Sequence, residues 1–485
     1  MDIQTKCVQA GYEPKNGDPR VLPLFQSTTY VYDTPEHLAK LFDLSVDGHI
    51  YTRISNPTVA AFEAKVNSLE GGVGAVACSS GLAAETLAIL NVCDAGDNIV
   101  SLATIYGGSF NLFNVTLRKY GIDTRFVSPK ASYEEIAKVI DDKTKIIYCE
   151  TLANPNMNIA NFELMSKIAK DFGILLMVDN TLATPIICRP FEHGANIVIH
   201  STTKYMDGHA SCVGGIIVDG GNFEFKGNPR YPEFNRPDES YHGLVYTDVA
   251  PASFSVKARV QMMRDLGSCM SPFNAYLTNL GAETLHLRMV KHSENALLCA
   301  KALSKNPKIE WVKYSGLEGD ANYDAAQKYF TNGLNSGMVV FGIKGDREQV
   351  CDFMKALKLI KIVTHIADTR TCILHPATTT HRQLSSEELV ACGISENLVR
   401  LSVGIENPYD LISDLEQALQ AINWFNTDFW REFLQGDEKY ANYYTKRFAG
   451  VQHTKWRECL CNAKGKGWNT GYKTDRNSYC KSYAY

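Results

Sequence analysis

The chain lacks several features by which whole classes of protein are recognised. No stretch of its 485 residues approaches the ~18 consecutive apolar residues of a membrane span, so we expect no membrane-embedded segment. Its first residues, MDIQTKCVQAGYEP, hold no basic stretch followed by an apolar one, which predicts a cytoplasmic protein. A formal net charge of only -4 gives no electrostatic basis for binding nucleic acid or a lipid surface.

Cysteine is not scarce, but the fourteen cysteines lack the spacing of a disulfide framework or a metal site. Cys78, Cys149 and Cys299 stand inside apolar runs, as buried and reduced thiols of the cytosol do. The one close pair, Cys459 and Cys461, has no histidine or second pair at zinc spacing, so no metal is predicted.

The loop after the apolar run 74–78 lacks both the glycine spacing and the lysine of nucleotide-binding loops. It reads Ser79-Ser80-Gly81 and leads into a strongly helical run from Leu82. The first amides of a helix are unpaired and its dipole attracts negative charge, so this point suits a single phosphate. The alternative is that Ser80 only caps the helix.

What the chain does have is a short apolar run, 197–199, that ends in the polar string HSTTKY. Open α/β sheets bind ligands at the carboxyl ends of their strands, so Lys204 in this string is a candidate for carbonyl chemistry. Partial burial lowers the pKa of a lysine, which a Schiff-base amine needs. The alternative is a solvated lysine in a turn.

A second candidate is Asp179, which directly follows five apolar residues in ILLMVDNT. Burying a carboxylate there is costly without a partner, unless it caps the next loop. One crossover separates it from Lys204, so both should face the same crevice. Tyr106 follows another apolar run and offers an aromatic face for a flat ring, or is a core tyrosine. Amine, acid, aromatic face and phosphate site together predict pyridoxal 5'-phosphate.

The order of helical and strand patterns predicts an α/β protein with two domains and an arm. Residues 1–60 carry few periodic runs and should form an N-terminal arm that contacts a neighbouring subunit. Residues 61–262 alternate helix and strand, which predicts a large domain with a mostly parallel sheet. Residues 263–422, with one long helical run over 275–303, predict a smaller α+β domain. In the arm, the guanidinium of Arg53 can bind a phosphate through two N–H groups, with the Tyr51 hydroxyl nearby. The alternative is an ordinary surface arginine.

The last segment, residues 423–485, forms an atypical aromatic and basic tail. It holds four of the five tryptophans, and its 11 Lys and Arg outnumber its 6 Asp and Glu. Interleaved aromatic and basic residues can stack on nucleobases, but no nucleic-acid module pattern is present. An appended packing segment or a late extension is the favoured interpretation.

Several strings of this chain resemble those of one known family. In order they are YTRISNPT, CSSGLAAE, IYGGSFNLF, CETLANP, VDNT, HSTTKY, HPATTTH and VRLSVGIE, and they span residues 1–422. They are similar to the pyridoxal-phosphate-dependent enzymes of cysteine and methionine metabolism, which implies the type I transferase fold. Within that family, GGSFNLF and the insertion at 219–244 are most similar to O-acetylhomoserine sulfhydrylases. Methionine γ-lyases typically have a cysteine at the position of Gly108.

The resemblance implies roles for individual residues. Lys204 would form the Schiff base, Asp179 would hold the pyridine nitrogen, and Tyr106 would stack on the ring and serve as acid or base. Tyr51 and Arg53 would reach the phosphate of a neighbouring subunit, which implies a homotetramer built as a dimer of dimers. The remaining cofactor contacts are expected at Ser80, Gly81, Leu82, Asn154, Ser201 and Thr203.

The substrate side of the expected site departs from the family pattern. Arg400 matches the arginine that holds the substrate α-carboxylate, with an outward strand arginine as the alternative. His365 stands where Ser or Asn is usual and Ala367 where glycine is usual. We expect His365, together with Arg400 and Tyr51, to contact the substrate and to bring a titratable group beside it.

The implied reaction is γ-replacement on O-acetyl-L-homoserine by sulfide or a small thiol, giving homocysteine or methionine. The alternatives are methionine γ-elimination, cystathionine formation or cleavage, and a non-catalytic protein that keeps the fold as a binding module. The sequence leaves open whether the leaving group is acetyl, succinyl or phospho, and which thiol is physiological.

Overall fold

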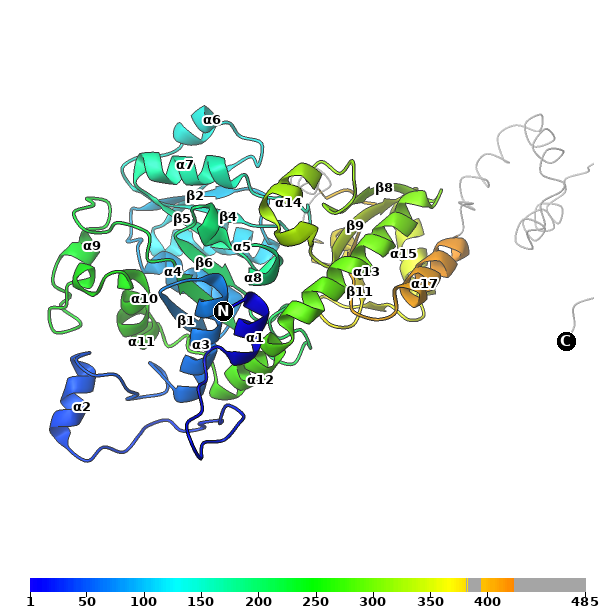
Figure 1. Ribbon diagram of the computed structural model, residues 1–485. Coiled ribbons are helices and arrows are strands. Elements are labelled where there is room, and N and C mark those ends of the chain that lie inside the picture. The colour runs from blue at the N-terminus through cyan, green and yellow to red at the C-terminus, as the bar shows by residue number, and fades with distance from the viewer. Residues whose placement is uncertain (381, 383–393, 423–485) are drawn as a thin grey trace, which may run out of the picture. The chain divides into compact units, whose positions relative to one another are not determined.

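The computed structural model describes residues 1–380, 382 and 394–422, so the tail predicted at 423–485 lies outside the described residues. Met1–Ile422 form one compact unit with two β-sheets. Figure 1 shows the larger sheet wrapped by helices and the smaller sheet covered by α13, α15 and α17. No helix in the described part of the chain is long and apolar enough to cross a membrane.

The large sheet has seven strands in the order β1-β7-β6-β5-β4-β2-β3. All run parallel except β7, which pairs antiparallel with both β1 and β6. The mixed but mostly parallel sheet confirms the predicted fold class. The strands are β1 (Gly74–Cys78), β2 (Asn98–Leu102), β3 (Asp123–Val127), β4 (Thr144–Glu150), β5 (Leu175–Asp179), β6 (Ile197–His200) and β7 (Gly215–Asp219).

Both faces of this sheet are buried, which explains why its strands read as unbroken apolar runs. Along β4, Ile147 and Cys149 belong to one core, and Ile146 and Tyr148 belong to the core on the opposite face. Alternate residues of a strand point to opposite faces, so a strand covered twice needs apolar residues at every position.

The helices that precede α13 lie around the large sheet or, in the case of α1 and α2, within residues 1–60. They are α1 (Ile3–Gln9), α2 (Pro35–Phe42), α3 (Pro57–Glu70), α4 (Gly81–Leu90), α5 (Gly107–Asn111), α6 (Tyr133–Ala137), α7 (Phe162–Phe172), α8 (Thr184–Ile187), α9 (Pro232–Asn235), α10 (Ser253–Lys257), α11 (Arg264–Leu266) and α12 (Pro272–Glu283). Asn56 caps α3 with its side chain, and Gly71 ends that helix in the left-handed conformation that glycine tolerates.

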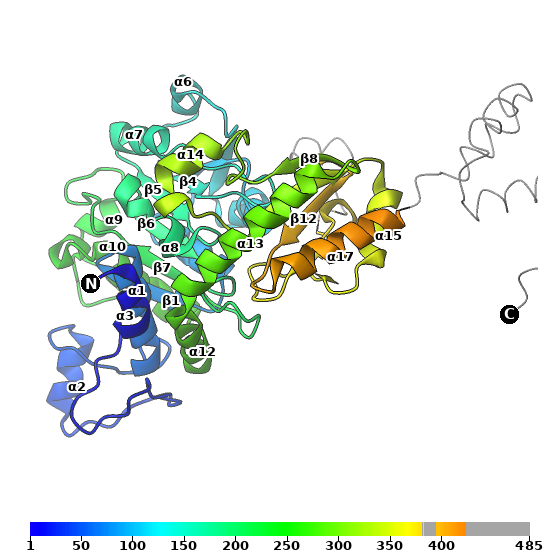
Figure 2. The ribbon, with the colours of Figure 1, turned by 45° about the vertical axis from the view of Figure 1, so that its right-hand side comes forward.

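The small sheet has five strands in the order β10-β11-β12-β9-β8. Its strands are β8 (Ile309–Lys313), β9 (Met338–Ile343), β10 (Lys361–Ile362), β11 (Cys372–Leu374) and β12 (Leu398–Ser402), and its helices are α13 (Leu285–Lys305), α14 (Tyr323–Tyr329), α15 (Arg347–Ala356) and α17 (Pro408–Ala421). The long α13 runs from the neighbourhood of α12 to the small sheet, as both ribbon views show (Figures 1 and 2).

The single helical run predicted over 275–303 is wrong, because α12 and α13 separate at Thr284. The buried Arg288 side chain explains the break. Its guanidinium donates to the carbonyl of Gly281 at 2.6 Å and to the carbonyl of Tyr205 at 2.6 Å. An arginine that satisfies the last carbonyls of one helix allows the chain to start another.

Candidate functional site

The predicted site residues gather where parallel strands of the large sheet end. In the register of the sheet Glu150 stands opposite Asp179, and Asp179 stands opposite Ile199, five residues before Lys204. Parallel strands end at one edge, so the side chains that follow β4, β5 and β6 face a common space.

Lys204 follows β6 in a tight turn and is only partly accessible to solvent. Burial, and after it the positive charge of Arg400, lower the pKa of its amine to about 8. An amine with this pKa is neutral in a substantial fraction of molecules near neutral pH, as a nucleophile or base must be.

Asp179 is held by the loop that follows its own strand. Its Oδ1 accepts the Thr181 amide at 2.8 Å, and the Thr181 hydroxyl accepts the Ser201 amide at 2.8 Å. Burial raises the pKa of Asp179, while the Thr181 hydrogen bonds and the charge of His200 oppose the rise. Thr181 therefore connects Asp179 to the loop that begins at Ser201. The sequence alone predicts no role for Thr181.

The start of α4 packs closely against Ser201, and the two together form a candidate anion-binding site. A Cβ on Gly81 would lie 2.7 Å from the Cβ of Ser201, so only glycine fits this approach. Ser80 caps the helix through its Oγ, which accepts the Ala83 amide at 3.1 Å. Within the described part of the chain no acceptor is recorded for the amides of Gly81 and Leu82, which leaves them for an anion.

The hydroxyl of Thr203, which the sequence predicts as a phosphate ligand, already makes two hydrogen bonds within the chain. Its Oγ1 donates to the carbonyl of Gly214 at 3.1 Å and accepts the Gly214 amide at 3.0 Å. A contact from this hydroxyl to a phosphate would require its proton to leave that carbonyl.

Tyr106 lies beyond β2 with its ring half exposed and resting against Gly108. A Cβ on Gly108 would lie 2.4 Å from the Tyr106 Cε1. The backbone amide of Tyr106 donates to Glu150 Oε1 at 2.5 Å. The ring is thus free to meet a ligand on one side while its backbone is anchored.

The small sheet contributes Arg400, from β12, to the same space. Its Nη1 lies 3.5 Å from the Oδ1 of Asn154, and its Nη2 donates to the carbonyl of Thr364 at 3.2 Å. Arg400 is buried, and burial lowers the pKa of its guanidinium. Asn154, in the loop after β4, is therefore beside the candidate carboxylate-binding arginine.

The two departures from the family pattern, His365 and Ala367, follow Thr364, whose carbonyl Arg400 contacts. The Nε2 of His365 is buried with no hydrogen-bond partner recorded in the described residues. Burial lowers the pKa of His365, as do the charges of Lys204 and Arg400. Ala367 is buried at φ 66°, a conformation that favours glycine, and its amide donates to Ser402 Oγ at 2.8 Å.

Tyr51 and Arg53 stand apart from this group in the single chain. The Arg53 guanidinium lies 5.3 Å from the centre of the Tyr51 ring and donates to the carbonyl of Arg264. Tyr51 is 40% exposed. Among the described residues no contact of either with Lys204 or Asp179 is recorded.

Three carboxylates lie on the Asp179 side of the site: Asp179 itself and the buried Glu85 and Glu150. Burial and the charge of Asp179 raise the pKa of Glu85 to about 8, and they raise the pKa of Glu150 as well. Glu85 accepts the Ser109 hydroxyl at 2.8 Å through one oxygen, and its other oxygen is buried without a recorded partner. A bound ring with an N–H beside Asp179 would offset this negative charge.

The residues present therefore fit pyridoxal phosphate. Free amides at the start of α4 suit its phosphate, Asp179 and its acidic neighbours suit a protonated ring nitrogen, and Lys204 suits its aldehyde. Sequence reasoning missed Glu150 and Thr181. The signal for Glu150 was present, since it ends an apolar strand as Asp179 does.

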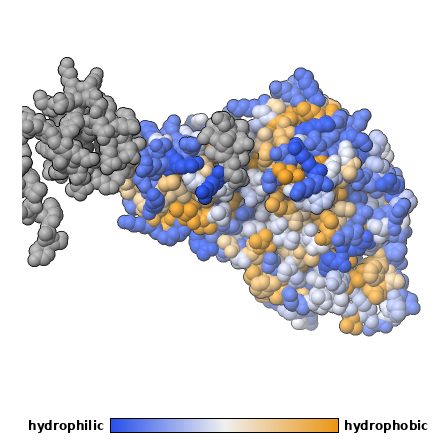
Figure 3. Space-filling view, turned by 180° about the vertical axis from the view of Figure 1, so that it is seen from behind, coloured by the Kyte–Doolittle hydropathy of each residue, from blue (hydrophilic) through white to orange (hydrophobic). Residues whose placement is uncertain are grey.

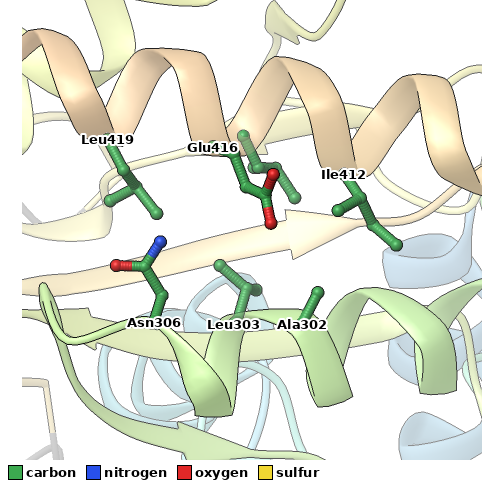
Figure 4. Close-up of a pocket in the computed structure, with 7 residues that line it drawn as sticks. Ala302, Leu303, Asn306, Ile412, Glu416 and Leu419 are labelled. Atoms are coloured by element: carbon green, nitrogen blue, oxygen red, sulfur yellow. The ribbon is translucent and has the colours of Figure 1, made fainter.

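Two other hollows do not belong to this site. A cavity of about 10 Å³ lies between α13 and α17 (Figure 4), which is room for one water at most. An open hollow of about 560 Å³ is lined from α7 to Tyr329 and carries paired surface charges such as Lys167 with Asp171. Within the described residues no group of three or more metal-ligating side chains occurs.

Comparison with known proteins gives consistent likenesses. The chain is 45% identical to an O-acetyl-L-homoserine sulfhydrylase of Leptospira meyeri, over 86% of this chain and 97% of that protein. It is 42% identical to a homocysteine synthase of Schizosaccharomyces pombe, over 86% of this chain and 98% of that protein. A Campylobacter jejuni structure described as an O-acetylhomoserine (thiol)-lyase carries a pyridoxyl-lysine phosphate. It is 36% identical and matches with a TM-score of 0.84, over 87% of this chain and all of that one.

The pattern of the Cys/Met metabolism PLP-dependent enzymes matches residues 4–420, which takes in both sheets and every element of the site. By this match and by the likenesses above, the chain belongs to the pyridoxal-phosphate-dependent enzymes of cysteine and methionine metabolism.

Proposed function

We propose that the protein replaces the γ-acetoxy group of O-acetyl-L-homoserine by sulfide or methanethiol, releasing acetate and forming homocysteine or methionine. The observation that carries this reaction is the likeness to sulfhydrylases and homocysteine synthases over 97% and 98% of their length. The open position at Gly108 supports it, because a side chain there would displace the Tyr106 ring.

Pyridoxal phosphate, when bound, supplies an aldehyde that condenses with amines and a ring that withdraws electrons from the neighbouring carbon. The chain would hold its phosphate through the amides of Gly81 and Leu82 and the hydroxyl of Ser201. Asp179 would keep a proton on the ring nitrogen, and Thr181 would keep Asp179 in place.

The other side chains would act on the amino acid. Arg400 would bind its α-carboxylate as a fork and so orient the Cα–H bond, with His365 beside it. Lys204, with its pKa lowered to about 8, would take the Cα proton. Tyr106 would donate a proton to the acetate as the Cγ–O bond breaks, and would take the S–H proton of the thiol as the Cγ–S bond forms.

We further propose a cytoplasmic homotetramer in which each site is completed by Tyr51 and Arg53 of a neighbouring subunit, with residues 1–60 as the joining arm. The arm supports this because it exposes many apolar side chains: Val21, Leu24, Phe25, Val31, Phe42, Leu44 and Val46. Figure 3 shows apolar residues at the lower edge of the molecule, where the arm lies. Such a surface is usually covered in an assembly.

Steady-state assays test the proposed reaction. O-Acetylhomoserine with sulfide should yield homocysteine and acetate, and omission of the thiol should stop turnover. Methionine alone yielding ammonia and 2-oxobutyrate would instead identify a γ-lyase, and turnover only with cysteine would identify cystathionine formation. Borohydride treatment of the cofactor-loaded protein should label Lys204, and a Lys204→Ala protein with full turnover would overturn the assignment.

A further inference from the structure

Glu150 is a buried carboxylate that no assigned role explains. It is the last residue of β4 and stands beside Asp179 in the register of the sheet. It lies on the same face of β4 as Ile146 and Tyr148, which are fully buried. A charge in such a place is costly unless other groups satisfy it.

Two backbone amides satisfy this carboxylate, and both belong to residues of the candidate site. Its Oε1 accepts the amide of Tyr106 at 2.5 Å, and its Oε2 accepts the amide of Asn154 at 3.3 Å. Tyr106 precedes Glu150 by 44 residues and lies after a different strand. One side chain therefore joins the loop after β2 to the loop after β4.

The connection continues to the small sheet. Asn154 meets Arg400 through its side chain, at 3.5 Å from Nη1. The aromatic ring that would stack on a cofactor and the guanidinium that would bind a carboxylate are thus both linked to Glu150. Burial and the charge of Asp179 raise the pKa of Glu150 well above its ordinary value, and the hydrogen bonds from the two amides oppose that rise.

We propose that Glu150 is a positioning residue whose two carboxyl oxygens fix Tyr106 and Asn154, and through Asn154 Arg400, around one ligand space. This role rests on the proposed function in so far as Tyr106 and Arg400 act on cofactor and substrate. Glutamine at this position keeps one acceptor oxygen, but its amide nitrogen cannot accept an N–H. Glu150→Gln should therefore retain one of the two anchors and Glu150→Ala neither.

Asp219 provides a matched control. It also ends a strand, β7, as a buried carboxylate, and its two oxygens accept the amides of Gly221 and Ser255 at 2.9 and 3.0 Å. Because β7 is antiparallel to β6, Asp219 pairs with Ile197, the first residue of β6, at the opposite edge of the sheet. Asp219→Asn should loosen the backbone at Gly221 and Ser255 and leave the candidate site unchanged.

The first test is hydrogen exchange of the cofactor-free protein, resolved to single amides. In Glu150→Ala the amides of Tyr106 and Asn154 should exchange at least tenfold faster than in wild type, and in Glu150→Gln at an intermediate rate. Asp219→Asn should change Gly221 and Ser255 only. Unchanged exchange at Tyr106 and Asn154 in both Glu150 variants overturns the proposal. If Glu150→Ala does not fold, Glu150→Gln decides alone.

The second test uses the cofactor-loaded protein. Glu150→Gln should still bind pyridoxal phosphate, but its visible circular dichroism should change and KM for O-acetylhomoserine should rise while kcat falls, each about tenfold. Asp219→Asn, compared at equal melting temperature, should match wild type in visible circular dichroism, KM and kcat. If the Tyr106 and Asn154 amides of Glu150→Gln exchange faster but its dichroism and kinetics equal those of wild type, the positioning role is overturned. A wild-type protein inactive on O-acetylhomoserine refutes the proposed function, while exchange and dichroism still decide Glu150.

Discussion

Arg400 and Asn154 meet across 246 residues of sequence, with the Arg400 Nη1 lying 3.5 Å from the Asn154 Oδ1. The contact joins β12 of the small sheet to the loop after β4 of the large one. Any change in the relative position of the two sheets would therefore move the candidate carboxylate fork with respect to Lys204.

The first prediction concerns the guanidinium of Arg400. Arg400→Ala should lower kcat/KM for O-acetylhomoserine about 30-fold or more, because removing a buried charged partner costs about 2–5 kcal/mol. Arg400→Lys should restore little, since an ammonium cannot bind a carboxylate with two parallel bonds. Arg189→Ala removes a surface arginine paired with Glu192 and serves as the control. Unchanged kinetics in Arg400→Ala would remove Arg400 from the site.

The second prediction concerns Gly108. Gly108→Ala should displace the Tyr106 ring, because the new Cβ would lie 2.4 Å from its Cε1. We expect kcat to fall about tenfold and the visible circular dichroism of the bound cofactor to change. In a Tyr106→Ala background the same glycine change should cost almost nothing, as for two residues that act through one contact. Equal losses in both backgrounds would show that Gly108 acts independently of the ring.

The structure shows which parts of this site a sequence can predict. Strands buried on both faces read as apolar runs, and Asp179 and Lys204 stood out as polar residues at the ends of two of them. Glu150 obeys the same rule and was available to the same reasoning. The contact between Arg400 and Asn154, by contrast, follows from the packing of two sheets; the family resemblance assigned both residues to the site but did not predict their contact.

Other features depend on groups that no local pattern contains. The break between α12 and α13 requires Arg288 to reach the carbonyls of Gly281 and Tyr205, the latter 83 residues away. The periodicity of residues 275–303 is continuous through that point and predicts one helix. Thr181 is similarly ordinary in sequence, and its link to Ser201 appears only when β5 and β6 pair.

The third prediction is a pH dependence for Lys204. Its folded pKa is lowered to about 8, chiefly by burial, so its neutral fraction rises tenfold per pH unit below 8 and levels off above. Capture of pyridoxal phosphate by the cofactor-free protein, followed by stopped-flow absorbance, should follow that curve. Arg400→Met removes a positive charge and should move the midpoint upward. A midpoint near 10.5 in wild type would mean that the amine is solvated.

The fourth prediction concerns His365, whose pKa is lowered first by burial and then by the charge of Lys204. Arg400 also lowers it, and Asp368 and Asp207 oppose the shift. Between its folded pKa and about 6.5 the unfolded chain binds more protons, so stability falls as pH falls through that window. His365→Asn should flatten the melting temperature below pH 6.5 and change little at pH 8. Parallel melting curves at all pH values would contradict the burial of a ring nitrogen that has no partner among residues 1–380, 382 and 394–422.

The last prediction tests whether two subunits share a site. Arg53→Ala and Lys204→Ala should each be inactive alone, the first because it lacks the phosphate fork and the second because it lacks the amine. If Arg53 serves the neighbouring subunit, random pairing of the two chains creates dimers with one intact site. An equal mixture should then recover about a quarter of wild-type activity.

A chain that carries both substitutions provides the control for that experiment. Wild-type chains mixed equally with the double variant Arg53→Ala/Lys204→Ala should keep about a quarter of the activity if sites are shared, and about a half if each chain uses its own Arg53. In the single chain Arg53 contacts Tyr51 and the Arg264 carbonyl, while Tyr51 is 40% exposed. No recovery in the first mixture, with a half retained in the second, would place Arg53 in its own chain's site and leave the exposed apolar arm without a catalytic purpose.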